Sequence, residues 1–330
     1  MRDTFRSVGI IGTGSYVPPR VLTNQDLEKM VDTSDEWIRT RTGILERRIA
    51  DEHTATSDLA MESAKAALCS AGVEAKDLDL IVVATVTPDM FFPCTASILQ
   101  EALGCPRPAA FDLLVGCTGF VYGLAIASSL LGAGAYERAL VIGAETLSKI
   151  TNWQDRSSCV LFGDGAGAAV LAPVEKGRGV LAYSLGNDAS NADALKIPAG
   201  GSRLPTSAKT VADELHYLHM VGSDVFKFAV RAMVDSSRVA VENAGLSLSD
   251  IDVLIPHQAN QRIIDAAAKR LNIPHERIVR NLERYGNTSA ASIPIALDEA
   301  VRDGLLKAGD TVLLSSFGAG LSWASMVLRW

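Results

Sequence analysis

The sequence has few cysteines, no long hydrophobic run and no excess of positive charge. Its five cysteines are odd in number and irregularly spaced, and none forms a CxxC pair, so neither a disulfide framework nor a zinc site is indicated. No stretch reaches the roughly 18 apolar residues of a membrane span without interruption by small residues. The N-terminus has no long apolar segment after its arginines. We therefore expect a cytoplasmic protein with no membrane association, no metal and at least one free thiol.

The net charge of −7 argues against general nucleic-acid binding. This net charge is compatible with a local basic patch that binds an acidic partner. Basic residues do cluster in "RTRTGILERR". The 330 residues are 48% hydrophobic and 21% charged, which is typical of a soluble globular enzyme. This length is enough for two domain-sized cores or one large duplicated core, at roughly 150 residues per domain.

The two halves of the sequence resemble one another. "AGVEAKDLDLIVVATVTPD", from Ala71, aligns without gaps on "AGLSLSDIDVLIPHQAN", from Ala244, an offset of 173. In each half a helical pattern precedes a β-branched run that is typical of a buried strand. We predict two similar α/β halves, 1–173 and 174–330, with buried, partly parallel sheets. Residues 180–222 have few periodic positions and are interpreted as an inserted loop that covers the site.

Cys117 is the strongest candidate for a nucleophile. "PAAFDLLV" before it predicts a strand and "FVYGLAIASSLL" after it predicts a buried helix. The thiol would then lie at the start of a helix, where free amides and the helix dipole stabilise an anion. Such a position favours a lowered thiol pKa. The alternative is a small buried hydrophobic residue, which is the common role of a single cysteine.

His257 and Asn287 lie in two further turns of the predicted fold. "DVLIPHQANQRII" places His257 directly after a buried strand and before a helix, and Asn287 lies in "RYGNTSAAS". The offset of 173 pairs Cys117 with Ala290, close to Asn287. Each residue alone is compatible with a structural role in a turn. A Cys, a His and an Asn in strand-to-helix turns of one α/β chain together indicate an active site.

Two glycine-rich segments do not fit nucleotide-binding motifs. In "IGTGSYVPP" the third glycine of a dinucleotide fingerprint is replaced by Val17, and the following prolines prevent the required helix. "FGDGAGAAV" is not followed by the Lys-Ser/Thr of a phosphate loop. We interpret both segments as tight turns.

With these residues in place, the sequence resembles the β-ketoacyl-[acyl-carrier-protein] synthase III family. The motifs "GTGSYVP", "DTSDEWIRTRTGI", "GCTGF", "FGDGAGAAVL", "PHQANQRII", "GNTSAAS" and "FGAGLSW" occur in this order over nearly the whole length. The resemblance implies a thiolase-like fold, an internally duplicated five-layer αβαβα arrangement. It also implies an acyltransferase of type II fatty-acid synthesis that condenses a short acyl-CoA with malonyl-[acyl-carrier protein].

The resemblance also implies roles for individual residues. Cys117 would be the nucleophile, and His257 with Asn287 the decarboxylation pair. The residues implied to bind coenzyme A are Thr33, Trp37, Arg41, Arg156 and Asn260. The carrier-protein site would include Lys227 and Arg262, the backbone amides of Cys117 and Ala319 would hold the oxyanion, and Phe92 would close the acyl pocket of a partner in a homodimer. The coenzyme A thioester is a substrate, and no permanently bound cofactor is expected.

Three positions depart from the family pattern. Gly116 and Thr118 flank the cysteine where many members have alanine, and Ala319 interrupts a glycine triplet. These departures affect the shape of the acyl pocket. The sequence therefore does not identify the starter acyl group.

The sequence is also compatible with other functions. A related condensing enzyme of secondary metabolism could use a different starter or acceptor. A degradative thiolase should carry a second cysteine in "SSFGAGLSW", and an extending synthase should carry a second histidine in place of Asn287. A catalytically silent partner subunit or carrier-binding module would not need the three catalytic side chains.

Overall fold

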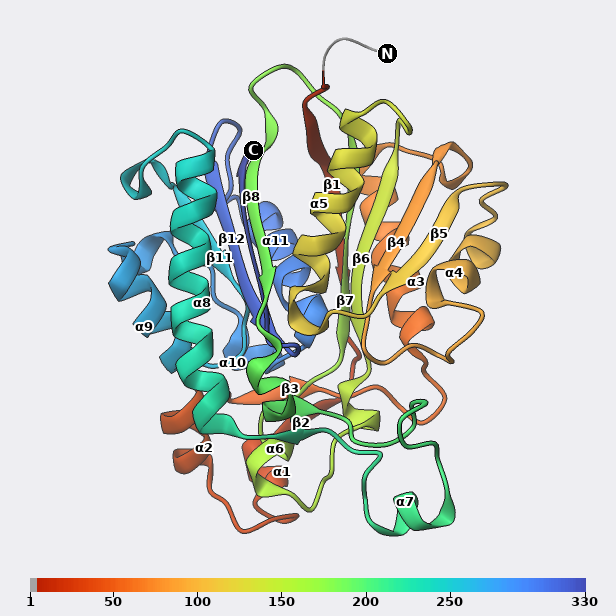
Figure 1. Ribbon diagram of the computed structural model, residues 1–330, viewed down its shortest axis with the longest axis vertical. Coiled ribbons are helices and arrows are strands. Elements are labelled where there is room, and N and C mark those ends of the chain that lie inside the picture. Colours follow the sequence, from red (N-terminus) through yellow and green to blue (C-terminus); the bar gives the residue numbers. More distant parts are fainter. Residues whose placement is uncertain (1–4) are drawn as a thin grey trace.

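Two β-sheets with corresponding strand orders form the centre of the molecule (Figure 1). The computed structural model describes residues 5–330. The first sheet has the order β1 (Val8–Tyr16), β7 (Gly165–Pro173), β6 (Ala139–Glu145), β4 (Leu80–Ala84) and β5 (Ala109–Leu113). The second has the order β8 (Gly179–Asn187), β13 (Ser322–Arg329), β12 (Thr311–Gly318) and β11 (Val253–Pro256). The sheets are partly parallel, as predicted, because β4 runs parallel to β5 and β6 and β11 runs parallel to β12.

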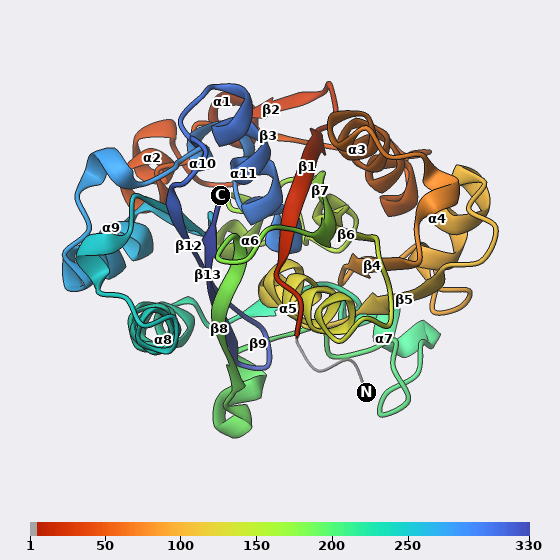
Figure 2. The same cartoon turned by 90° about the horizontal axis from the view of Figure 1, so that it is seen from above.

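Helices separate and cover the two sheets. The helices are α1 (Asn24–Leu27), α2 (Asp35–Thr42), α3 (Thr56–Ala71), α4 (Thr95–Leu103), α5 (Gly119–Gly132), α6 (Arg156–Cys159), α7 (Ala208–Ala212), α8 (Gly222–Asn243), α9 (Gln261–Leu271), α10 (Leu282–Tyr285) and α11 (Ser292–Arg302). Seen from above, α3 and α4 lie outside the first sheet, α5 and α11 lie between the sheets, and α8 and α9 lie outside the second (Figure 2). The expected five-layer αβαβα arrangement is confirmed.

Short elements complete the chain. Two small sheets pair β2 (Val21–Thr23) with β3 (Glu46–Arg48) and β9 (Leu195–Lys196) with β10 (His219–Met220). Single helical turns of the 3₁₀ type are η1 (Ala75–Asp77), η2 (Gly116–Thr118), η3 (Leu147–Lys149), η4 (Ala189–Ala194), η5 (Leu248–Asp250), η6 (His275–Arg277) and η7 (Ser289–Ala291). Two of these turns, η2 and η7, contact each other at the centre of the fold.

The internal duplication is visible element by element. An offset of 173 carries the start of β4 onto the start of β11 and η2 onto η7. The fifth strand of the second sheet is reduced to an isolated bridge between Leu254 and Ile278. β4 is buried along its whole length because helices cover both faces of its sheet. α5 carries no charged residue and is buried by contacts with both sheets.

The segment predicted as an inserted loop over 180–222 begins later than expected. Residues Gly179–Asn187 form β8, which pairs with β13 along the edge of the second sheet. Most of its positions are partly exposed, so the strand lacks the continuous apolar run that marks a buried strand. The largely irregular part runs over residues 188–221, and three of its residues, Leu195, Leu218 and Met220, line the cavity described below. The predicted boundary at 173/174 falls between the end of β7 and the start of β8.

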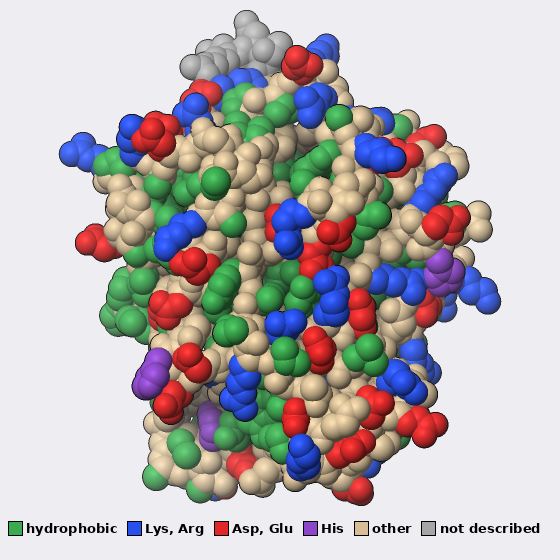
Figure 3. Space-filling model, turned by 180° about the vertical axis from the view of Figure 1, so that it is seen from behind, with side chains coloured by type: hydrophobic (Ala, Val, Ile, Leu, Met, Phe, Trp, Pro, Cys, Tyr) green, Lys and Arg blue, Asp and Glu red, His purple; other side chains and the backbone are tan. Residues whose placement is uncertain are grey.

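The surface is mixed in charge on the face opposite to that of Figure 1. Acidic and basic side chains are interspersed there (Figure 3). Within residues 5–330, no helix is long and apolar enough to cross a membrane.

Candidate active site

The turns that carry Cys117, His257 and Asn287 meet at one cavity. Cys117 lies in η2 between β5 and α5, His257 directly follows β11, and Asn287 directly precedes the turn into η7. All three side chains line a cavity of about 240 Å³. Strand ends at one edge of each sheet bring these turns together. The sequence prediction that the three residues form one site therefore agrees with the geometry.

The Cys117 thiol lies in a densely packed environment at the start of α5. Gly116 before it has a φ of +59°, a conformation that side chains other than glycine rarely adopt. The pKa of the Cys117 thiol is raised to about 12, chiefly by burial and to a smaller extent by the nearby Glu145, while a hydrogen bond from Ser289 opposes the rise. The expectation of a lowered pKa is thus wrong for the resting protein, because loss of hydration outweighs the stabilisation offered by the helix start.

His257 is a neutral side chain whose ring orientation is fixed. It is 1% exposed, and burial lowers its pKa to about 3. Its Nδ1 lies 2.6 Å from the Ser292 hydroxyl oxygen. That oxygen also accepts a hydrogen bond of 3.4 Å from the Gln258 amide. In the tautomer in which the Ser292 hydroxyl donates to Nδ1, the imidazole proton resides on Nε2. Nε2 is buried and has no partner in the described part of the protein, which leaves its N–H available to a substrate in the cavity.

Asn287 presents its amide NH₂ group to the same cavity. Its Oδ1 accepts a hydrogen bond of 2.9 Å from the Ser289 amide, which leaves Nδ2 as the free end of the side chain. Its backbone is also fixed, because Asn287 donates to the Leu161 carbonyl at 2.8 Å and accepts from the Gly163 amide at 3.0 Å. The site thus offers two neutral donors, one from His257 and one from Asn287.

The hairpin between β12 and β13 packs against η2. A Cβ atom added to Gly318 would lie 2.8 Å from the Cys117 nitrogen, and one added to Gly116 would lie 3.1 Å from the Ala319 nitrogen. The backbones of Cys117 and Ala319 are therefore close neighbours, and both residues line the cavity.

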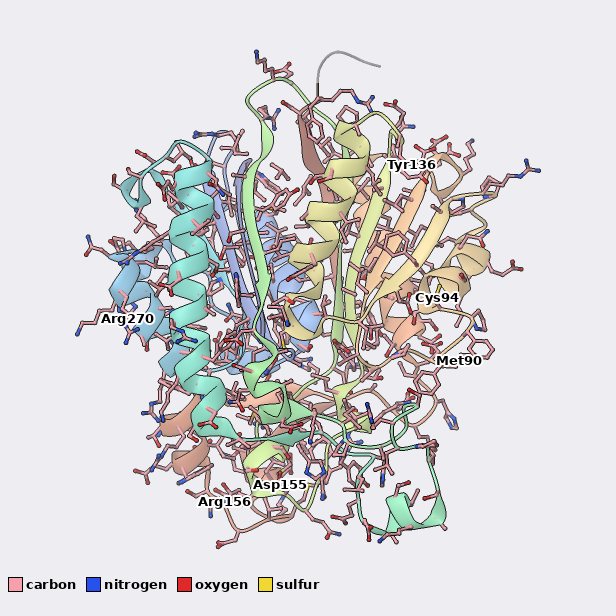
Figure 4. The ribbon with its side chains drawn as sticks, viewed as in Figure 1. Met90, Cys94, Tyr136, Asp155, Arg156 and Arg270 are labelled. Carbon is pink, nitrogen blue, oxygen red and sulfur yellow. The ribbon has the colours of Figure 1, made fainter. Side chains whose placement is uncertain are left out.

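The predicted coenzyme A residues form a cluster beside the cavity. The Arg156 guanidinium lies 4.3 Å from the centre of the Trp37 ring, and that of Arg41 lies 6.0 Å from it. Asn260 lines the cavity and donates a hydrogen bond of 3.1 Å to the Arg41 carbonyl. The buried Thr33 hydroxyl has no partner among residues 5–330. Of this group only Asn260 lines the cavity itself. Arg156 lies on α6 at the lower end of the molecule (Figure 4).

The other predicted residues lie at the surface. Lys227 on α8 and Arg262 on α9 are exposed, and the Arg262 guanidinium lies 5.7 Å from the ring of Phe226, which lines the cavity. Phe92 is 84% exposed and does not line the cavity of its own chain. It adjoins the exposed Met90, which lies on the α4 side of the molecule (Figure 4).

Three polar residues of the site were not singled out in the sequence. Ser289 and Ser292 lie in "NTSAAS", where small residues conceal their contacts with Cys117 and His257. Glu145 ends the apolar run "ALVIGAE" and is fully buried. A carboxylate at the end of a buried strand is the one signal that could have identified it. No cluster of three or more potential metal ligands occurs within residues 5–330.

Comparisons with known proteins agree with this fold. A family model for 3-oxoacyl-[acyl-carrier-protein (ACP)] synthase III matches residues 111–189, and the model of its C-terminal part matches residues 241–330. The chain is 60% identical over 324 residues to a β-ketoacyl-[acyl-carrier-protein] synthase III of Caldanaerobacter subterraneus subsp. tengcongensis, with 98% of each chain covered.

Solved structures show the same similarity. The β-ketoacyl-[acyl carrier protein] synthase III of Thermus thermophilus is 51% identical, with a TM-score of 0.92 over 98% of this chain and 99% of that chain. The priming β-ketosynthase of the R1128 polyketide biosynthetic pathway is 36% identical, with a TM-score of 0.92 over 100% of this chain and 98% of that one. Because such identity extends over almost the full length and the thiolase-type fold is shared, this chain belongs to the β-ketoacyl-[acyl-carrier-protein] synthase III family of acyltransferases.

Proposed function

We propose that the chain condenses a short acyl-CoA, with acetyl-CoA as the first candidate, and malonyl-[acyl-carrier protein] to a 3-oxoacyl-[acyl-carrier protein]. The observation that carries this proposal is the convergence of the Cys117 thiol, the His257 Nε2 and the Asn287 amide on one buried cavity. The product would initiate type II fatty-acid synthesis. The higher identity to β-ketoacyl synthases III than to the polyketide-priming enzyme favours this role over a starter enzyme of secondary metabolism.

In the first half-reaction the Cys117 sulfur attacks the thioester carbonyl of the acyl-CoA. The amides of Cys117 and Ala319 hold the developing oxyanion. Collapse of the tetrahedral intermediate releases coenzyme A and leaves the acyl group on Cys117. The cluster of Trp37, Arg41 and Arg156 would bind the nucleotide end, because guanidinium groups pair with phosphates and an indole stacks on adenine.

In the second half-reaction malonyl-carrier protein replaces coenzyme A. The Nε2–H of His257 and the amide of Asn287 donate hydrogen bonds to the malonyl thioester oxygen, which stabilises the enolate as carbon dioxide leaves. The enolate carbon then attacks the acyl carbonyl on Cys117, and the sulfur is released as the new carbon–carbon bond forms. A neutral imidazole suits this role, because it donates a hydrogen bond without adding a charge to the buried cavity.

Further parts of the proposal concern partners and location. Lys227 and Arg262 would dock the acidic carrier protein at the rim of the cavity, where charge pairing chiefly accelerates encounter. The exposed Phe92 would enter the acyl pocket of a second copy of the chain in a homodimer. We place the enzyme in the cytoplasm, without a permanently bound cofactor.

The experiment that tests the proposal follows the acyl group. Incubation with acetyl-CoA should add one acetyl group, which peptide mapping should find on Cys117. Malonyl-carrier protein should then remove it with release of carbon dioxide. Cys117→Ala should gain no acetyl group, whereas Cys69→Ala, which removes an exposed thiol, should behave as the wild type. Acetyl found on another residue, or loading of Cys117→Ala, would contradict the proposal.

A further inference from the structure

Arg47 is a buried arginine that the mechanism above does not use. It lies in β3 and is 0% exposed. Burial lowers the pKa of Arg47 to about 10, so its guanidinium is still charged at neutral pH. The guanidinium donates hydrogen bonds to the Val160 carbonyl at 2.7 Å, the Asn24 Oδ1 at 2.9 Å and the Leu22 carbonyl at 3.3 Å. All three acceptors are uncharged, and a buried charge without an anionic partner is costly.

Asn24 continues this network to the start of α2. Its side chain is also 0% exposed. While its Oδ1 accepts from Arg47, its Nδ2 donates to the Asp35 carboxylate at 2.8 Å and to the Ile44 carbonyl at 2.9 Å. Asp35 is the first residue of α2. We call the side chains of Arg47, Asn24 and Asp35 the polar clamp.

The polar clamp joins the two helices that carry predicted coenzyme A residues. Asp35 begins α2, which contains Trp37. Val160 directly follows α6, which begins with Arg156. Three consecutive hydrogen bonds therefore connect the backbone at the end of α6 to the side chain at the start of α2. Both helices lie at the lower end of the molecule (Figure 1).

Apolar packing alone does not fix the spacing of these helices. Ile38 of α2 and Cys159 of α6 belong to one apolar cluster, and Trp37 packs against it. Such packing is not directional, whereas a guanidinium donates hydrogen bonds in a fixed fork geometry. An apolar side chain in place of Arg47 would fill the same space without the cost of burying a charge. The directional contacts of Arg47 therefore set the spacing of α2 and α6, across which the Arg156 guanidinium lies 4.3 Å from the centre of the Trp37 ring.

We propose that the polar clamp positions Trp37 and Arg156 to bind the nucleotide end of coenzyme A, an inference that rests on the proposed function. Its three members are positioning residues, because none of them lines the cavity and each acts through the helices. Disconnecting the clamp should weaken the binding of a thioester that carries the nucleotide. It should not affect a short thioester that reaches only Cys117.

The test compares two donors that acetylate Cys117. One is acetyl-CoA, and the other is S-acetyl-N-acetylcysteamine, which has the thioester but no nucleotide. Rapid quench and intact mass give the acetylation rate over a range of donor concentrations. Arg47→Met and Asp35→Ala each remove one end of the clamp, and both should raise the half-saturating concentration of acetyl-CoA about 10-fold while the maximal rate stays unchanged. Their rates with S-acetyl-N-acetylcysteamine should equal that of the wild type.

Matched controls separate the hydrogen bonds from the substitutions themselves. Asp35→Asn keeps an oxygen that can accept from the Asn24 Nδ2, so it should behave as the wild type, unlike Asp35→Ala. Arg277→Met also removes an arginine, but one that donates to the Ser249 and Ile251 carbonyls, which lie in neither helix. It should leave both donors unaffected. Asp35 is only partly buried, so its two variants decide the question even if Arg47→Met does not fold.

Three results would overturn the role of the polar clamp. Asp35→Ala could have the wild-type half-saturating concentration of acetyl-CoA, Asp35→Asn could lose as much as Asp35→Ala, or the variants could react more slowly with both donors to the same extent. The last result would indicate a general distortion of the site. A wild type that neither donor acetylates at Cys117 would overturn the proposed function, and the role of the clamp with it.

Discussion

At the scale of single residues, the site combines a thiol and an imidazole that are both neutral at rest. Burial raises the pKa of Cys117 to about 12 and lowers that of His257 to about 3. The same loss of hydration acts in opposite directions because one group is charged when deprotonated and the other when protonated. Both shifts favour the neutral thiol and the neutral imidazole over an ion pair between them. In the proposed mechanism the two groups act in separate steps, Cys117 in acyl transfer and His257 in stabilisation of the enolate.

Asn287→Asp separates these two steps. The new carboxylate can still accept the hydrogen bond from the Ser289 amide, but it replaces the free NH₂ donor with a negative charge that repels the enolate. We expect acetylation of Cys117 by acetyl-CoA to continue, while decarboxylation of malonyl-carrier protein falls by about 100- to 1,000-fold. Release of labelled carbon dioxide measures the second step. Normal decarboxylation, or a folded variant that cannot be acetylated, would show that Asn287 has a different role.

At the scale of elements, the contact between the β12–β13 hairpin and η2 positions the backbone amides of the site. Gly318 ends β12 and faces the Cys117 nitrogen without an intervening side chain. The hairpin and η2 come from different halves of the chain. Their contact therefore couples the position of the proposed oxyanion donors to the packing of the two halves.

Gly318→Ala tests the importance of this contact. The added Cβ would lie 2.8 Å from the Cys117 nitrogen, so the backbone must shift and the amide of Cys117 is displaced. Loss of one oxyanion donor commonly lowers a rate by about 100-fold or more, and we expect a similar loss in the acetylation rate. Gly201→Ala, where no atom lies within 4 Å of the added Cβ, is the control. Equal acetylation rates for the two variants would refute this role of the hairpin.

The elements that could be predicted from the sequence are those with strong periodic patterns. The strand around Val82 and the helix after Cys117 were predicted because their burial on both sides requires long apolar runs. The edge strand β8 was not predicted, since partial exposure leaves no such run. The internal duplication also predicts that the turns carrying Cys117, His257 and Asn287 lie close together.

The protonation state of Cys117 could not be predicted in the same way. The sequence indicates a helix start, but it does not show how much protein surrounds the sulfur. That environment depends on Ser289 and Glu145, which are distant from Cys117 along the chain. Their contacts arise only when the two halves pack together.

At the scale of the whole molecule, an exposed aromatic segment remains outside the packed core. Phe91 and Phe92 are 81% and 84% exposed, next to Met90 at 50%. Side chains of this kind are seldom left in water as a group. The proposed homodimer would bury them and place Phe92 in the acyl pocket of the second copy.

Phe92→Thr should change the selectivity for the acyl group. A smaller side chain leaves more space at the end of the partner's pocket, so acyl-CoAs with longer or branched chains should be used relatively better than acetyl-CoA. Competition between acyl-CoAs of graded length measures the change, and sedimentation gives the oligomeric state. Leu305→Thr alters an exposed side chain after α11 and should leave the selectivity unchanged. A fully active monomer, or an unchanged selectivity in Phe92→Thr, would contradict the prediction.

The enclosed position of the Cys117 sulfur also bears on chemical damage. Peroxides and alkylating agents react with thiolates, and a thiol whose pKa is raised by burial is less ionised at neutral pH than a free thiol. Between turnovers this shift disfavours reaction of the Cys117 sulfur with such reagents, although the residue lines a cavity. A thioester whose carbonyl oxygen lies at the amides of Cys117 and Ala319 would be stabilised by them as it reacts. A small oxidant would not be. Partial burial of the proposed nucleophile therefore favours its protonated form, which reacts more slowly with oxidants than the thiolate does.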